Sequence, residues 1–151
     1  MRYLLDTGIL LRLPDRGDPL HAIVRASVRS LSRQELVTTT QNIAEFWNVC
    51  TRPTAARGGL GLSDHEVQRR LRLLERFIGV LREPPSAFDK WKKIVVACKV
   101  HGRQVHDARL VALMKSYRIK RILTLNAADF GRYPGINAIT PQEVVHGLGT
   151  S

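Results

Sequence analysis

An α/β fold, with a parallel sheet covered by helices on both faces, is predicted from the order of hydrophobic patterns along this chain of 151 residues. Short apolar runs next to turn signals are typical of buried strands, and they alternate with longer stretches in which apolar residues recur at helical spacing. Capping residues and prolines mark the ends of several of the longer stretches. Strands that alternate with helices in this way form parallel sheets, because each crossover lays a helix on one face.

Four segments are expected to form the strands of this sheet. Each is short and apolar or rich in β-branched residues. They are "RYLL" (2–5), "ELVTT" (35–39), "RILTL" (121–125) and the end of "GINAIT" (135–140). A further short strand fits near "LREPPS" (81–86), where two prolines exclude a helix.

The helices are expected between these strands. Their ranges are 19–32, 40–52 with Thr40 as N-cap, 63–81, 87–100, 106–118 and a last helix that begins at "TP" (140–141). In the 63–81 helix, Ser63 and Glu66 form a capping-box pattern, and Ile78 and Leu81 continue the apolar face. The stretch "ARGGLGL" (56–62) is expected to be a loop.

A single domain over residues 1–147 is expected, followed by a short frayed tail at 148–151. The length is usual for one compact domain, and no internal repeat, low-complexity tract or linker is visible. Cys50 and Cys98 lack the CxxC spacing of zinc and redox sites. They are therefore expected to be reduced cysteines of a cytoplasmic protein.

No membrane or secretion segment is expected. The longest apolar runs, such as "IVVAC" (94–98), are far shorter than the roughly 20 residues that cross a bilayer. Asp6 comes too early for the apolar region of a signal peptide.

The chain is strongly basic. It contains 24 Lys and Arg residues against 13 Asp and Glu residues, a formal net charge of +11. A field of that sign favours a polyanion, which leaves nucleic acid, an anionic membrane surface or an acidic partner protein as candidates.

Four acidic residues are placed where the ends of the expected elements converge. Asp6 and Asp129 follow strands, Asp107 opens an apolar helix, and Glu45 lies one turn into the helix after the second strand. Ligands of open α/β sheets bind beyond the carboxyl ends of the strands. Clustered carboxylates need cations, and Mg²⁺ or Mn²⁺ suits an oxygen-rich site. A cluster of carboxylates can bind the metal, and the basic surface around it can bind phosphates. This combination indicates a metal-dependent nuclease.

Each acid also has a structural explanation when taken alone. Asp6 suits a turn or a helix N-cap, Asp107 suits a helix N-terminus, and Asp129 suits the cap of a short helical turn. Glu45 lies on a polar helix stripe and is, by itself, a solvated side chain. The five histidines share no metal-ligand spacing, and neither GxSxG nor a P-loop motif occurs.

The motifs, taken in order, resemble PIN-domain ribonucleases and, within them, the VapC-like toxins of bacterial type II toxin–antitoxin systems. The resemblance covers nearly the whole chain. It rests on "YLLDTGILL" (3–11), "QNIAEFWNVCTRP" (41–53), "GLGLS" (59–63) and "VHDARLVALMKSYRIKRILTLNAADFGRYPGI" (105–136).

The resemblance implies a three-layer α/β/α sandwich with four to five parallel strands, and Mg²⁺- or Mn²⁺-dependent cleavage of RNA. Asp6, Glu45 and Asp107 match the core metal-binding and catalytic acids, and Asp129 matches a more variable fourth. Three supporting polar residues match positions around the metal: Thr7, Thr124 and Asn126. Three arginines are candidates for contacting RNA: Arg12, Arg52 and Arg109.

Two positions depart from the family pattern. Gly8 stands where the family usually has Asn, and we expect it to serve the turn after Asp6 and to leave a tuned but active site. Asn126 stands where some PIN nucleases have a further Asp, so the number of metal ions, one or two, stays open.

The resemblance also implies partners. Such toxins form homodimers and are held inactive by a cognate antitoxin, which wraps the toxin with a hydrophobic segment. Two alternative functions stay open from the sequence. One is a catalytically impaired PIN-like module that binds RNA, and the other is a nuclease of the same fold directed at DNA.

Overall fold

A computed structural model describes residues 1–147; the expected tail at 148–151 lies outside the described residues. Its centre is a sheet of five parallel strands in the order β3-β2-β1-β4-β5. The strands are β1 (Arg2–Leu5), β2 (Glu35–Thr39), β3 (Gly79–Leu81), β4 (Arg121–Leu123) and β5 (Asn137–Ile139). The predicted parallel sheet is confirmed.

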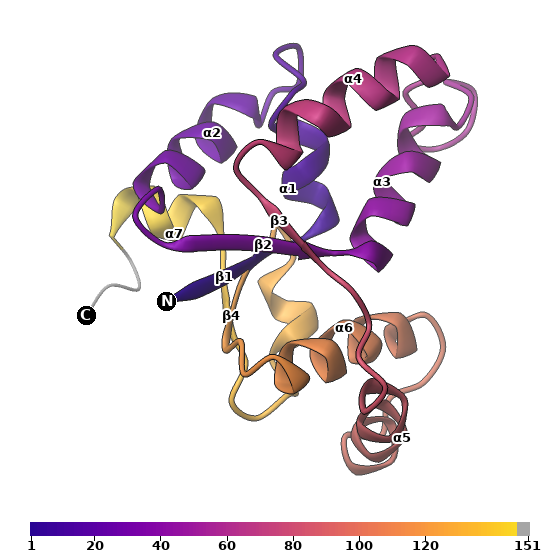
Figure 1. The fold of residues 1–151 in the computed structure, drawn as a ribbon, viewed down its shortest axis with the longest axis vertical. Helices are drawn as coiled ribbons and strands as arrows, with labels where there is room; N and C mark the ends of the chain where they lie inside the picture. The colour runs from indigo at the N-terminus through magenta and orange to yellow at the C-terminus, as the bar shows by residue number, and fades with distance from the viewer. Residues whose placement is uncertain (148–151) are drawn as a thin grey trace.

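Helices cover both faces of this sheet, as Figure 1 shows. Their bounds are α1 (Thr7–Arg12), α2 (His21–Ser30), α3 (Thr40–Thr51), α4 (Asp64–Glu75), α5 (Ala87–Ala97), α6 (Gln104–Ser116) and α7 (Pro141–His146), with a 3₁₀ turn, η1 (Ala127–Phe130). One hydrophobic core lies between the sheet and α1 to α4, with α7 at its side. A second core lies under α5, α6 and η1. The three-layer sandwich is therefore confirmed.

Strand β1 shows why an apolar run predicts a central strand. Leu4 packs into the core below the sheet, and Tyr3 and Leu5 pack into the core above it. Successive side chains of a strand point to opposite faces, so a strand buried on both sides must be apolar throughout.

The expected helix over 63–81 is wrong at its C-terminal end. Helix α4 ends at Glu75, and the chain then enters β3 at Gly79, earlier than the strand expected near 81–86. Ile78 continues the apolar spacing of α4 and is buried in the same core, although it lies outside the helix. Pairing of Gly79 with Val37 explains the change, because the strand satisfies backbone groups along the edge of β2.

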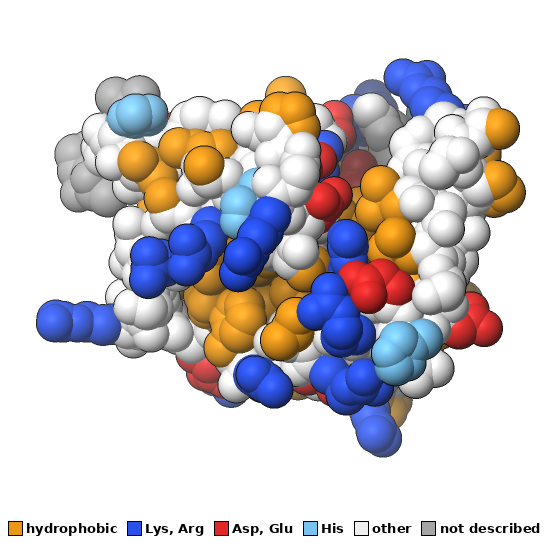
Figure 2. All heavy atoms as spheres, turned by 90° about the horizontal axis from the view of Figure 1, so that it is seen from above, with side chains coloured by type: hydrophobic (Ala, Val, Ile, Leu, Met, Phe, Trp, Pro, Cys, Tyr) orange, Lys and Arg blue, Asp and Glu red, His pale blue; other side chains and the backbone are white. Residues whose placement is uncertain are grey.

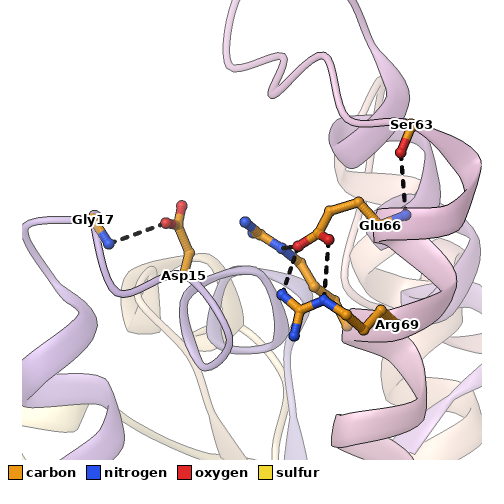
Figure 3. Close-up of polar contacts among 6 residues, drawn as sticks. Asp15, Gly17, Ser63, Glu66 and Arg69 are labelled. Carbon is orange, nitrogen blue, oxygen red and sulfur yellow. Dashed lines mark hydrogen bonds and ion pairs between the residues drawn. The ribbon is translucent and has the colours of Figure 1, made fainter.

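Several helix starts differ from the sequence-based expectations by a residue or two. The N-cap of α3 is Thr39 rather than Thr40, and α6 begins at Gln104 rather than 106. The Ser63 hydroxyl caps α4 by accepting from the Glu66 amide, but the Glu66 carboxylate turns toward Arg69 instead of closing a capping box (Figure 3). A complete capping box is found at Thr140, the start of α7.

No helix within residues 1–147 combines the length and apolar character needed to span a membrane.

Candidate functional site

Asp6 lies at the carboxyl edge of the sheet, where the two central strands end side by side. Leu5 of β1 pairs with Leu123 of β4, and the Asp6 amide donates to the Leu123 carbonyl at 3.0 Å. The same carboxylate caps α1 by accepting from the Thr7 amide at 2.9 Å. The N-cap interpretation of Asp6 is therefore correct, and it is compatible with a further role, because one carboxylate has several acceptor positions.

Thr124 holds the second oxygen of this carboxylate. Its hydroxyl donates to Asp6 Oδ2 at 2.7 Å and accepts from the Asn126 amide at 3.1 Å. Thr124 is completely buried. Asn126 therefore supports the site through its backbone, by fixing the hydroxyl that binds Asp6.

Glu45 reaches the same place from α3. Its Oε2 accepts from the Thr7 hydroxyl at 2.7 Å, and its Oε1 lies 3.5 Å from Gln41 Nε2. Gln41 also donates to the His106 carbonyl at 3.2 Å, which connects α3 to the first turn of α6. Although Glu45 is exposed, its carboxylate is thus held in place by a neighbouring element.

Asn42 is a site residue that the sequence analysis missed. It is 1% exposed, and its Nδ2 donates to Thr7 Oγ1 at 3.0 Å and to Asp6 Oδ1 at 3.3 Å. Its Oδ1 accepts from the Thr39 hydroxyl at 2.6 Å. The signal available in the sequence was its spacing: Asn42 precedes Glu45 by three residues, which places both on one helix face.

Asp107 lies in the first turn of α6, and its carboxylate accepts no hydrogen bond from any residue in 1–147. The pKa of Asp107 is raised to about 6, first by burial and then by the negative charges of Asp6, Asp129 and Glu45, while His106 lowers it. Burial is likewise the main cause of the raised pKa of Asp6, with Glu45 and Asp129 adding to it, whereas bonds from Thr124 and Thr7 lower it. The four acids thus act on one another across a short range.

Asp129 lies on η1, after β4, and is exposed. It contributes to the raised pKa values of both Asp6 and Asp107. The structure thus brings all four predicted acids to the carboxyl edge of the sheet.

The chemistry of these groups fits a hard divalent cation. The donors are carboxylate oxygens, which Mg²⁺ and Mn²⁺ prefer. Within residues 1–147, no three side chains of His, Cys, Asp or Glu are already grouped closely enough to hold one ion. Burial is the largest cause of the raised pKa of Asp107, and the repulsion from the other acids that adds to it is the effect that a bound cation would relieve.

The three candidate RNA-binding arginines each have a partner within the chain. Arg12 donates to the Gly8 carbonyl at 3.1 Å and lies 3.3 Å from Asp18 Oδ1. Arg52 donates to a backbone carbonyl at 2.8 Å, that of Arg57. Arg109 forms a two-point ion pair with Glu83, at 3.1 and 2.8 Å. Of the three, Arg109 lies nearest in sequence to a site acid, two residues after Asp107.

The expected turn at Gly8 is wrong, because α1 begins at Thr7 and Gly8 is its second residue. A Cβ atom at this position would lie 3.1 Å from Leu125 Cδ1 and 3.6 Å from Arg12 Nη1. Both neighbours are ends of flexible side chains, so α1 has room for a larger residue after a small adjustment.

A family model described as PIN domain matches residues 3–136. No curated protein matches this sequence.

Several solved structures share the fold. VapBC2 from Rickettsia felis, bound to a DNA fragment from its promoter, is 12% identical with a TM-score of 0.72, covering 93% of this chain and 98% of that one. VapBC-1 from nontypeable Haemophilus influenzae is 20% identical with a TM-score of 0.66, covering 94% and 99%. VapC20 from Mycobacterium tuberculosis, a toxin that cleaves the sarcin-ricin loop, is 16% identical with a TM-score of 0.57, covering 80% and 86%. At these identities the likeness establishes the fold.

Proposed function

This chain belongs to the PIN domain family, and from that premise we propose that it is a metal-dependent endoribonuclease that acts as the toxin of a toxin–antitoxin pair. The observation that carries the proposal is electrostatic. Asp6, Glu45 and Asp129 come from three separate elements, and all of them act on the protonation of Asp107. Acids that repel one another at a sheet edge are costly unless a cation joins them.

The four acids Asp6, Glu45, Asp107 and Asp129 would hold Mg²⁺ or Mn²⁺. A divalent ion bound there supplies a water of lowered pKa and neutralises charge on the scissile phosphate. The remaining polar residues orient the ligands. Thr124 and Asn42 fix Asp6, and Thr7 fixes Glu45, so these carboxylates do not have to reorganise on binding.

Protonation of Asp107 is expected to limit metal binding, and therefore cleavage, at low pH. With a pKa of about 6, it is ionised at neutral pH and becomes protonated as the pH falls. A protonated carboxyl is a poor metal ligand, so the proposed cleavage declines below pH 6 at limiting metal concentration.

The basic surface supports nucleic acid as the substrate class. The chain as a whole carries a formal net charge of +11 even with these four acids counted, and cations on the surface attract the phosphates of a polyanion. The PIN fold is shared with VapC20, a toxin that cleaves the sarcin-ricin loop. Both facts favour structured RNA.

A groove between α2 and α4 is the surface that we propose for the antitoxin. It has a volume of about 420 Å³ and lies on the face shown in Figure 2, where apolar side chains are bordered by basic ones. Its buried floor includes Val28, Leu36 and Leu74. Phe77 is 49% exposed at its edge, and Arg25 and Arg29 make no ion pair with any residue in 1–147. An apolar segment with acidic side chains fits both features.

The antitoxin surface can be tested by co-expression with the protein encoded next to this one. Phe77→Asp should prevent relief of growth arrest and recovery of a complex on size exclusion. Val145→Asp, which alters another exposed apolar residue outside the groove, should leave both unchanged. Equal effects of the two variants would contradict antitoxin binding at this groove.

We expect the protein to be a cytoplasmic homodimer, and sedimentation analysis of the purified chain tests the dimer.

The nuclease function is tested with end-labelled tRNA in Mg²⁺ or Mn²⁺, with parallel samples containing EDTA or the Asp107→Asn variant. Discrete fragments that require both the metal and Asp107 are expected. Intact RNA in every lane, together with a tight, salt-sensitive complex, would instead indicate an RNA-binding module. Matched DNA oligonucleotides in the same series test the DNA-directed alternative, because only RNA should be cut.

A further inference from the structure

A pocket of about 670 Å³ lies between the start of α5 and the start of α6, on the side of the sheet away from the α2–α4 groove. It is open to solvent and mostly apolar. Its lining includes Pro85, Phe88, Trp91, Val105, His106 and Arg109. The proposed chemistry at the four acids does not use this pocket.

The pocket contains a fixed aromatic surface. Phe88 is 59% exposed and stacks with Trp91, with ring centroids 6.1 Å apart and planes inclined by 25°. Trp91 Nε1 donates to the Val105 carbonyl at 2.8 Å, which fixes the indole. An exposed aromatic ring held against a fixed one is an unusual surface to leave in water, and it presents a flat apolar face to a ligand.

The pocket adjoins the acidic site through a single turn of helix. His106 lines the pocket, and the next residue, Asp107, belongs to the acidic site. The His106 carbonyl accepts from Gln41, whose side chain also reaches Glu45. The pocket and the acidic site are therefore neighbours at the start of α6, and a strand whose phosphate meets the carboxylates would run past the pocket.

Charge around the pocket suits a polyanion. Helix α5 carries Lys90, Lys92 and Lys93, and the Lys92 ammonium lies 4.8 Å from the centroid of the Phe88 ring. The one acid that lines the pocket, Glu83, is paired with Arg109, so it presents little uncompensated negative charge.

We propose that this pocket binds an unstacked nucleobase of the substrate strand, next to the phosphate that is cleaved, with Phe88 as the stacking surface. The proposal rests on the proposed nuclease function and names how that site would choose a position along RNA. Single-stranded and looped RNA is recognised by stacking of splayed bases on aromatic side chains. A second copy of this chain fits the pocket less well, because two such faces would bring their α5 lysines together.

The test measures RNA binding separately from cleavage. The protein carries Asp107→Asn to prevent cutting, and its affinity for short labelled oligoadenylate, oligouridylate and oligocytidylate is measured by fluorescence anisotropy. Phe88→Ala should weaken binding about ten-fold, the usual scale for one stacked base. Phe88→Trp, which keeps an aromatic face, should restore most of the affinity. Val96→Ala is the matched control, since Val96 is 77% exposed on the same helix but does not line the pocket.

The outcomes are distinguishable. Loss of affinity with Phe88→Ala, but not with Val96→Ala, supports a base-binding pocket even if the unmodified chain proves unable to cut RNA. Equal affinity of all variants overturns the pocket but leaves the nuclease function intact. Unchanged RNA affinity together with weaker self-association of Phe88→Ala, measured by sedimentation, would assign the pocket to a second copy and overturn the proposal.

Discussion

Two carboxylates of the same edge, Asp6 after β1 and Asp107 at the start of α6, are held in opposite ways. Asp6 receives hydrogen bonds from a backbone amide, a threonine hydroxyl and a buried asparagine amide. Asp107 receives none from residues 1–147, and its pKa is raised to about 6 by burial and by its acidic neighbours. The first acid is already oriented by hydrogen bonds within the fold, whereas the second has no such bond, and the proposed metal ion would supply its missing partner. The two acids therefore allow separate tests of the part of the site that the fold orients and of the part for which we propose a metal ion.

The largest expected effect on stability comes from replacing Asn42, the buried amide that bonds to Asp6 and Thr7. Asn42→Leu deletes the donors to Asp6 and Thr7 and leaves the Thr39 hydroxyl without its acceptor. Unsatisfied buried groups cost about 1–3 kcal/mol each, so the free energy of unfolding should fall by about 3 kcal/mol. Urea denaturation measures it. The control is Asn48→Leu, an exposed position of the same helix, and an equal loss there would contradict the role of Asn42.

Thr124 tests the other anchor of Asp6. Thr124→Val keeps the shape but removes the hydroxyl that donates to Asp6 Oδ2 and accepts from the Asn126 amide. We expect a loss of about 2 kcal/mol in unfolding free energy and weaker cleavage, because Asp6 loses its shortest hydrogen bond. Thr51→Val is a suitable control, since that hydroxyl bonds only to a helix carbonyl. Unchanged stability and activity of Thr124→Val would contradict the role of this hydroxyl in orienting the Asp6 carboxylate.

Removing the charge of Asp107 should raise the free energy of unfolding, whereas the two substitutions above lower it. A carboxyl whose pKa is raised in the folded state favours folding when protonated, and this stabilisation is lost as the pH rises through about 6. Asp107→Asn removes the repelling charge, so in EDTA at pH 7.5 the variant should be more stable than the unmodified chain, by about 1 kcal/mol after solvent screening.

The added stability of Asp107→Asn should disappear near pH 4, where the carboxyl of the unmodified chain is also uncharged. Thermal unfolding at pH 7.5 and pH 4 measures this difference in stability. Asp64→Asn, at an exposed acid in the first turn of α4, should show no such gain. A variant of Asp107 that is less stable at pH 7.5 would contradict the account.

The smallest effect is expected at Gly8. Gly8→Asn gains helix propensity but pushes its Cβ to 3.1 Å from Leu125 Cδ1, a side chain that can move. The gain in helix propensity and the cost of the close contact oppose each other, so the free energy of unfolding should change by less than about 0.5 kcal/mol, with cleavage retained. Stability and tRNA cleavage are measured together. A large gain in activity would show that the glycine limits the site.

The same contrast explains what the sequence could predict. Strands such as β1 were predictable because a strand buried on both faces must be apolar, a local property of the chain. The placement of Asp6, Asp107 and Asp129 at one edge of the sheet was predictable because strand ends and helix starts fix where such residues lie in an α/β fold. The end of α4 was not, since Ile78 continues the helical spacing but packs from the segment before β3.

The polar network was beyond reach of the sequence for a related reason. Asn42 acts through bonds to Asp6 and Thr7, which are 36 and 35 residues away along the chain. Its spacing from Glu45 places it on the same helix face, but that spacing alone does not distinguish it from a polar residue on a solvated helix face. Likewise, the pairing of Arg109 with Glu83 spans 26 residues and depends on how α6 packs beside the segment after β3.

Binding of Mn²⁺ tests the central claim most directly, because it requires neither RNA nor an antitoxin. Free Mn²⁺ gives a paramagnetic resonance signal that is lost on binding, so titration of the purified chain reports the affinity. We expect the unmodified chain to bind Mn²⁺, Asp107→Asn to lose much of the affinity, and Asp64→Asn to keep it. Absence of binding by the unmodified chain, or equal binding by all three proteins, would contradict a metal site built from these four carboxylates.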